Sequence, residues 1–116
     1  MTVNMLDYDK LSKIFSALAN PTRLRILDKL RFGKATVSEL AEPFSMSLPG
    51  ITNHLKVLEK AGLIFKGQEA QWRPTQLAFR PLKDIDLWLN KYREIWDVRL
   101  TNLDNFMKKL REKENE

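Results

Sequence analysis

Residues 36–62 read TVSELAEPFSMSLPGITNHLKVLEKAG, and their spacing predicts two helices joined by a tight turn. Thr36, followed three residues later by Glu39, is the capping-box pattern that opens a helix. Pro43 ends this first helix, because its ring removes a hydrogen-bond donor and clashes with the preceding turn. A second helix is expected over about residues 47–61. Such a helix-turn-helix can present its second helix to the major groove of DNA.

The second helix of this pair has two distinct faces. Its N-cap is Ser47, and Gly62 ends it, because glycine readily adopts the left-handed conformation found after helices. At about 100° per residue, one narrow stripe is apolar and is expected to pack inward; it consists of Ile51, Leu55 and Leu58. The remaining surface is polar and cationic, as suits contacts with base edges and phosphates. The DNA contacts predicted on this helix are made by Ser47, Thr52, Asn53, His54 and Lys56.

Two features of this helix have alternative explanations. Any amphipathic helix has a solvated face that carries lysines, so the polar surface alone does not establish DNA binding. His54 lies at the edge of the apolar stripe. It either donates a hydrogen bond to DNA or fills the seam beside the core.

Composition excludes several classes of function. The chain has 116 residues and no cysteine, which excludes disulfides, thiolate metal sites and cysteine nucleophiles. It has one histidine and no glycine-rich phosphate loop, so neither an enzyme nor a cofactor is expected. It also has no apolar run long enough to span a membrane and no leader-like segment, so the expected location is the cytoplasm. The predicted organisation is one domain over residues 1–110 and a frayed, charged tail over residues 111–116.

The net charge of +5 is unevenly distributed. Residues 1–35 hold seven Lys and Arg against three Asp and Glu, residues 36–80 hold five against four, and residues 81–116 hold eight against eight. The excess therefore falls within residues 1–80, the part of the chain that includes the helix-turn-helix, as expected for a polyanionic partner.

Two further helices are predicted before the helix-turn-helix. The first covers residues 6–18, with an apolar side formed by Leu6, Leu11, Ile14, Phe15 and Leu18. Asn20 and Pro21 mark the start of the second as its N-cap and first position. The expected buried face of the second helix consists of Leu24, Ile26, Leu27 and Leu30. Its cations are expected on a solvated surface, unless one or two reach a phosphate; they are Arg23, Arg25, Lys29 and Arg31.

Residues 63–77 change to a strand pattern and predict a β-hairpin, a "wing" after the helix-turn-helix. Pro74 confines the second strand to a sheet edge, because proline cannot donate to a ladder. Trp72 is expected to pack rather than to stack on bases. The predicted wing contacts with DNA are Lys66, Gln68, Gln71 and Arg73.

Residues 81–110 predict one long helix of about 45 Å, since no glycine or proline interrupts them after Pro81. Its apolar residues recur at nearly heptad spacing, the pattern of a helix that pairs with another helix. The predicted homodimer interface consists of Ile85, Leu89, Tyr92, Trp96, Leu100, Leu103 and Met107. Two alternatives remain, a helix that lies across its own domain and a small-molecule pocket lined by Trp88, Tyr92 and Trp96.

Three stretches together resemble the ArsR-type family of small bacterial repressors over about residues 8–107. They are FSALANPTRLRILDKL (15–30), VSELAEPFSMSLPGITNHLKVLEKAGLI (37–64) and QWRPTQLAFRPLKDIDLWLNKYREIW (71–96). The resemblance implies a mainly α winged helix-turn-helix fold with a small β-hairpin and a long C-terminal dimerisation helix. It also implies a homodimeric repressor that binds double-stranded DNA at an inverted repeat, with the helix over residues 47–58 in the major groove.

The chain departs from the family pattern at several positions. Leu48 stands where the pattern has a polar residue, and Asn53 stands where it has a cation. Thr36 and Ser38 occupy the positions of a metal-binding Cys-Val-Cys pair, and the resemblance is to a subgroup without such cysteines. We therefore expect no metal site, and the inducing ligand stays unknown. The alternative functions are a winged-helix module that binds a protein and a repressor gated by a small organic ligand.

Overall fold

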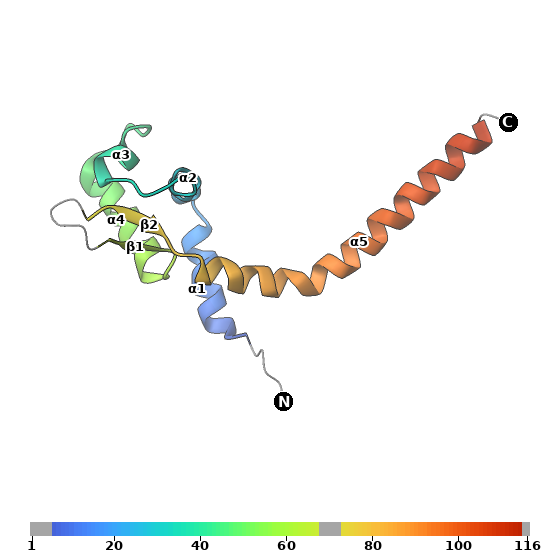
Figure 1. Cartoon of the computed structure of the whole chain (residues 1–116), viewed down its shortest axis with the longest axis horizontal. Helices are drawn as coiled ribbons and strands as arrows, with labels where there is room; N and C mark the ends of the chain where they lie inside the picture. Colours follow the sequence, from blue (N-terminus) through green and yellow to red (C-terminus); the bar gives the residue numbers. More distant parts are fainter. Residues whose placement is uncertain (1–5, 68–72, 115–116) are drawn as a thin grey trace. The chain divides into compact units, whose positions relative to one another are not determined.

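The computed structural model describes residues 6–67 and 73–114. It is mainly α-helical with one two-stranded hairpin, as the sequence predicts. The chain forms two compact units, unit 1 (Met1–Asp84) and unit 2 (Ile85–Glu116), which are described separately (Figure 1). The predicted single domain over residues 1–110 stays a prediction.

Unit 1 begins with two capped helices, α1 (Tyr8–Leu18) and α2 (Pro21–Leu30). α1 starts two residues later than predicted, because Asp7 is its N-cap and accepts a hydrogen bond from the backbone of Lys10 at 3.1 Å. The predicted start of α2 is confirmed. The Asn20 side chain accepts from the backbone N–H groups of Thr22 and Arg23, and Pro21 stands in the first turn.

The buried faces of α1 and α2 are narrower than the sequence suggests. Leu11, Ile14 and Ala17 are the buried residues of α1, whereas Phe15 is exposed. On α2 the buried residues are Ile26 and Leu30, and Leu24 is about half exposed. The prediction that Leu24 is buried was wrong, because helical spacing gives the direction of a stripe but not how much of it the neighbouring helices cover.

The helix-turn-helix consists of α3 (Val37–Ala41) and α4 (Leu48–Lys60), which pack against each other. Both predicted caps are confirmed. Thr36 and Glu39 form the complete capping box of α3, and Ser47 accepts a hydrogen bond from the backbone of Gly50 at 3.3 Å. Gly62 follows the C-cap of α4 with φ of 77°, the left-handed conformation that glycine adopts without strain.

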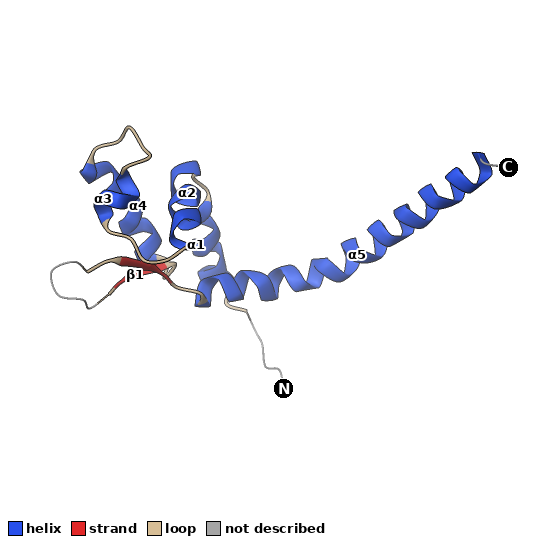
Figure 2. Ribbon diagram, turned by 45° about the horizontal axis from the view of Figure 1, so that its top comes forward, coloured by secondary structure: helices blue, strands red, loops and turns tan. Residues whose placement is uncertain are grey.

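The hairpin pairs β1 (Ile64–Lys66) with β2 (Thr75–Leu77) in antiparallel register, Phe65 opposite Gln76. It lies alongside α4 in unit 1 (Figure 2). β2 is an edge strand of this two-stranded sheet, as predicted, and only its first residue, Thr75, also pairs with Ala35 through an isolated bridge. Pro74 is accommodated because it precedes the strand and contributes only its carbonyl, which accepts from Gly67.

One core joins these elements of unit 1. Leu40, Ile51, Leu58 and Leu63 are completely buried, and they come from α3, α4 and the start of the hairpin. Leu55 adds the third residue of the predicted α4 stripe at 3% exposure. This core fixes α4 by one face and leaves its other face open.

α5 (Arg80–Glu114) begins in unit 1 and forms the described part of unit 2. It runs four residues beyond the predicted end at Leu110, so the frayed tail predicted over residues 111–116 is wrong for residues 111–114. The helix continues because these residues are good helix formers, and the basic Arg111 and Lys113 suit its C-terminal dipole. Pro81 is its one buried residue among those described.

Candidate nucleic-acid interface

The open face of α4 carries the predicted helix contacts. Asn53 and Lys56 are exposed, and Thr52 is partly exposed. Ser47 is exposed at the start of the helix, but its hydroxyl oxygen already serves as the N-cap acceptor. The structure therefore places all four on one accessible helix, where amide, hydroxyl and ammonium groups face solvent.

His54 is linked to a second helix by an arginine that the sequence did not single out. Arg23 of α2 places Nη1 3.2 Å from His54 Nδ1 on α4. The same guanidinium donates from Nε to the carbonyl of Ala17 at 2.5 Å and from Nη2 to the carbonyl of Ser16 at 3.4 Å. Arg23 thus connects the end of α1, the start of α2 and the middle of α4.

This contact determines which nitrogen of His54 can donate. An arginine guanidinium has donors only, so His54 Nδ1 is the acceptor and the hydrogen of the neutral ring is on Nε2. Nε2 has no partner in residues 6–67 and 73–114 and is therefore available to donate to an external acceptor. The two explanations offered for His54 are compatible, because one nitrogen faces the protein and the other remains free.

Arg23 is not the solvated cation that the sequence favoured. Only a contact between residues 31 positions apart reveals its role, and no local pattern carries that information. Lys29 was likewise expected on a solvated surface, but its Nζ donates to the backbone carbonyl of Glu39 at the first turn of α3. Both cations fasten the helix-turn-helix to α2.

The capping box of α3 is electrostatically reinforced. The carboxylate of Glu39 accepts from the Thr36 backbone N–H at 3.1 Å and from the Thr36 hydroxyl at 3.0 Å. These hydrogen bonds, with a smaller contribution from the charge of Lys29, lower the pKa of Glu39 below its ordinary value of 4.5. Glu39 is thus held ionised at the helix N-terminus, where negative charge is favourable.

The described part of the hairpin places two of the four predicted wing contacts near each other. Lys66 ends β1, and Arg73 precedes β2 by two residues; both are exposed. The Gly67 N–H, which follows Lys66, donates to the carbonyl of Pro74, which follows Arg73, at 2.8 Å. This hydrogen bond joins the two sides of the hairpin next to both cations. Gln68 and Gln71, like Trp72, lie outside the described residues.

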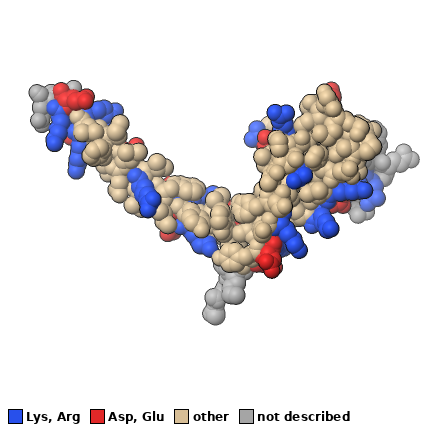
Figure 3. All heavy atoms as spheres, turned by 180° about the vertical axis from the view of Figure 1, so that it is seen from behind, with Lys and Arg blue, Asp and Glu red and all other residues tan. Residues whose placement is uncertain are grey.

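Basic side chains are spread over unit 1. The visible face in Figure 3 carries many more Lys and Arg side chains than acidic ones on this unit, including several on the side of the hairpin. The same view shows an uncharged strip that runs along α5 between charged side chains. The two units therefore present chemically different surfaces.

The predicted dimer interface on α5 is largely exposed. Tyr92, Trp96, Leu100, Leu103 and Met107 are all exposed, and Leu100 and Leu103 retain 55% and 54% of their accessible surface. Ile85 and Leu89 are partly exposed. Trp88 and Tyr92 contact each other with ring centroids 5.0 Å apart, and Arg93 pairs with Asp86 at 2.6 Å. Unit 2 thus has a charged face and a large apolar face that no described residue covers.

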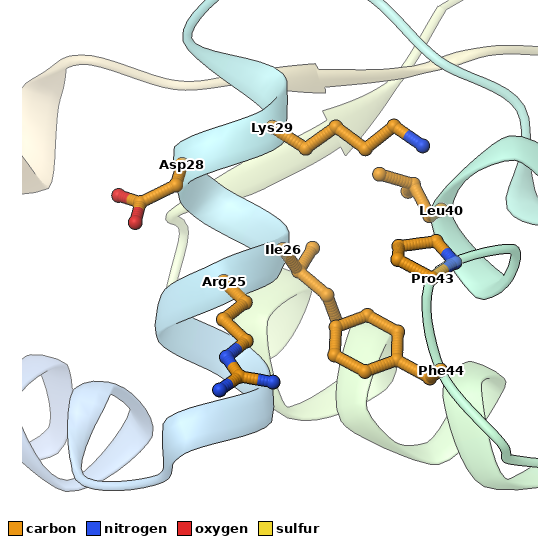
Figure 4. A pocket seen from close by; sticks show the side chains of 7 residues that line it. All are labelled: Arg25, Ile26, Asp28, Lys29, Leu40, Pro43 and Phe44. Carbon is orange, nitrogen blue, oxygen red and sulfur yellow. The ribbon is translucent and has the colours of Figure 1, made fainter.

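A hollow of about 240 Å³ lies in unit 1 between α2 and the segment after α3 (Figure 4). Ile26, Leu40, Pro43 and Phe44 line it with apolar atoms, and the carboxylate of Asp28 points away from them. Pockets for organic ligands usually measure roughly 300–1,000 Å³. The hollow is therefore small for an effector site, and it does not include the predicted Trp88, Tyr92 and Trp96.

Metal-ligand clusters and membrane-spanning helices are both absent from the described residues. In residues 6–67 and 73–114, no three His, Asp or Glu side chains are grouped as metal ligands. Among the helices of that part of the chain, none has the length and apolar character to cross a bilayer.

Residues 18–64 match the family model described as a helix-turn-helix domain. The transcriptional repressor SdpR of Bacillus subtilis is 34% identical over 79 residues, which cover 68% of this chain and 88% of that protein. The crystal structure of an ArsR family transcriptional regulator is 40% identical, covers 76% of this chain and 97% of its own, and has a TM-score of 0.69.

The chain belongs to the ArsR family of winged helix-turn-helix transcriptional regulators. The resemblance, the fold class and the regulatory function predicted from the sequence are confirmed.

A second similar structure bears on assembly. It is the solution structure of a homodimeric winged helix-turn-helix DNA-binding domain from Mycobacterium bovis, described as a possible ArsR-family regulator. It is 25% identical, covers 85% of this chain and 94% of its own, and has a TM-score of 0.59. The polar face of α4 and the apolar face of α5 are both left uncovered by the described residues.

Proposed function

We propose that this ArsR-family chain is a homodimeric repressor that binds an inverted-repeat operator in double-stranded DNA and performs no enzymatic reaction. The main support for the proposal is the exposed polar face of α4. The opposite, apolar face of this helix packs into the core of unit 1 and so fixes the position of α4. Half-sites about one helical turn apart suit two such helices related by a two-fold axis. Because bacterial DNA lies in the cytoplasm, this proposal also places the protein there.

In this proposal the contacts come from α4 and the wing. Asn53 and Thr52 donate to and accept from base edges, and His54 donates from Nε2 to a phosphate or a base. Lys56, Lys66 and Arg73 neutralise phosphates, because their exposed cations have no ion-pair partner in residues 6–67 and 73–114. Ser47, Gln68 and Gln71 complete the proposed set.

The second surface, the apolar face of α5, supports the dimer. When α5 is unpaired, its large apolar side chains stay exposed to water. Burying them against a partner stabilises the protein by roughly 1.5–3 kcal/mol for each fully buried side chain. The same face of a second copy is a self-complementary cover, as two-fold symmetry requires. The homodimer reported for the similar Mycobacterium bovis structure supports this arrangement.

Selection from a random duplex library, followed by titration of the selected duplex, tests the function. We expect an enriched inverted repeat that is bound at nanomolar dimer. Three phosphate-neutralising cations per chain predict that log K falls with log salt with a slope of about −5. Tight binding that does not respond to salt, or no enriched duplex, would contradict the proposal.

The paired variant Asn53→Ala/Lys56→Ala locates the site. It should weaken binding by at least about tenfold and reduce the salt slope by about 2 per dimer, because one phosphate contact is lost from each chain. The matched control is Val57→Ala, which changes an exposed residue on the same helix outside the proposed contacts. If both variants bind DNA as the unchanged protein does, the interface lies elsewhere.

A further inference from the structure

The first turn of α4 is apolar, although it begins the helix proposed to read DNA. After the Ser47 cap come Leu48, Pro49 and Gly50, and none of these side chains can hydrogen-bond. Leu48 stands at the first position of the helix and keeps 52% of its surface exposed. Pro49 is exposed beside it, so the start of the helix proposed to contact DNA is both apolar and accessible.

Leu48 is continuous with the proposed contact residues. Residues four apart lie on one side of a helix, so Leu48 begins a row that continues with Thr52 and Lys56. Leu48 also stands seven residues before the buried Leu55, so it lies at the border between this row and the buried stripe of α4. The row begins with an isobutyl group, continues with a hydroxyl and a methyl group, and ends with an exposed cation. Val57, the other exposed large apolar residue of the helix, lies on the opposite side from Leu48.

The turn before α4 adds to this apolar tip. A Cβ atom built on Gly50 lies 2.8 Å from Cγ of Met46, so the absence of a side chain at Gly50 lets Met46 lie over the helix start. Met46 keeps 36% of its surface exposed. Glycine is unfavourable inside a helix, and the close approach of Met46 gives a local packing reason for it at Gly50.

The major groove of B-DNA presents one apolar group at the base edges, the 5-methyl group of thymine. A guanine or cytosine edge placed against Leu48 loses hydrogen bonds to water without replacement, which is unfavourable. The flanking cation at Lys56 favours a polyanion over an apolar protein surface as the partner of this row.

We propose that Leu48 contacts the 5-methyl group of a thymine in each half-site and thereby helps determine operator sequence. The inference rests on the proposed function and deepens it, because it names the base that the tip of α4 selects. A thymine is then required at that position, and cytosine, which lacks the methyl group, is disfavoured.

Deoxyuridine substitution tests the contact, because it removes only the methyl group. Each thymine of the selected operator is replaced in turn, and the affinity of the full-length dimer is measured. We expect one position per half-site at which the replacement weakens binding about fourfold, or about 15-fold when both half-sites are changed. The other positions should respond less.

The variant Leu48→Ala completes a double-mutant cycle. It should bind the thymine-containing operator about tenfold more weakly and no longer distinguish thymine from deoxyuridine at the sensitive position. Val57→Ala should keep the full distinction. Circular dichroism and sedimentation establish that both variants remain folded and dimeric.

Three results would overturn the inference while the proposed function stands. They are an operator indifferent to every deoxyuridine, a deoxyuridine effect that persists unchanged in Leu48→Ala, and operator binding by Leu48→Ala equal to that of the unchanged protein. If no duplex is enriched at all, the proposed function fails and this inference with it.

Discussion

Unit 1 and unit 2 are built from similar proportions of apolar residues but use them in opposite ways. Unit 1 closes a core in which Leu40, Ile51, Leu58 and Leu63 are inaccessible to water. In unit 2, Leu100 and Leu103 expose more than half of their surface. Unit 1 forms a core within the chain, although side chains such as Phe32 and Phe79 stay exposed, whereas the apolar face of unit 2 requires an external partner.

The polar face of α4 and the apolar face of α5 serve different roles, because only α4 is supported by a core. A closed core holds α4 rigidly enough to present specific side chains, since sites on well-supported helices keep their geometry. α5 has no such core beside it in the described part of unit 2. A helix in a protein is stabilised mainly by packing of its apolar face against other elements, and no described residue covers the apolar face of α5. We therefore expect α5 to be stable when it is paired with a second copy.

The largest effect is expected when charged residues are introduced into the exposed apolar face of α5. Leu100→Glu/Leu103→Glu places two carboxylates per chain in the proposed interface and should raise the dimer dissociation constant at least about 100-fold. Analytical ultracentrifugation measures it. The matched control is Asn105→Glu on the opposite side of α5, which should leave the dimer intact. If the two variants have the same dimer dissociation constant, the dimer interface does not lie on this face of α5.

The next test compares equal truncations in the two units. Leu58→Ala opens a cavity in the unit 1 core and should lower the free energy of unfolding by about 3 kcal/mol. Leu103→Ala should instead lower the melting temperature most at low protein concentration, because it weakens association. Calorimetry over a range of concentrations distinguishes them, and a concentration-independent effect of Leu103→Ala would contradict the comparison.

A smaller effect is expected at the link between α2 and α4. Arg23→Met keeps the alkyl chain but removes the guanidinium, and it should lower stability by about 1.5–2 kcal/mol and weaken DNA binding about tenfold. Arg25→Met on the same helix is the control, since no partner of Arg25 occurs among the described residues.

The role of Arg23 is also visible spectroscopically. His54 is the chain's single histidine, so ¹⁵N spectra report one imidazole. In the unchanged protein Nδ1 should be unprotonated and Nε2 protonated, and Arg23→Met should reduce this preference. A neutral ring with its hydrogen on Nδ1 in the unchanged protein would rule out the proposed donor.

The smallest effect concerns the capping box of α3. Thr36→Ala should cost about 1 kcal/mol of stability at neutral pH. Because the pKa of Glu39 is lowered in the folded state, its ionised carboxylate stabilises the fold above pH 4.5, and this contribution is lost as the pH falls through the lowered pKa.

Urea unfolding of the unchanged protein and of Glu39→Gln at several pH values measures this contribution. The difference between the two should be constant near neutral pH and shrink as the medium becomes acidic. A difference that grows on acidification would contradict the capping-box assignment.

The sequence predicts best the features that depend on neighbouring residues. The caps at Asn20, Thr36 and Ser47 could be located because each relies on a donor two or three positions away. The buried stripe of α4 follows equally from helical spacing.

Features that depend on distant residues could not be predicted in this way. The pairing of Thr75 with Ala35 and the contact of Arg23 with His54 join segments far apart in the chain. The exposure of Leu24 depends on how far neighbouring helices reach, which periodicity does not specify. For the candidate site, spacing indicated which face of α4 is open, but the arginine that orients His54 required three-dimensional structure.

Sedimentation equilibrium of the free protein and of its complex with the selected duplex determines whether two chains act together. We expect two chains per duplex, with the free protein already dimeric at micromolar concentration. A single chain bound per duplex, with a free protein that stays monomeric at that concentration, would contradict the proposed homodimer.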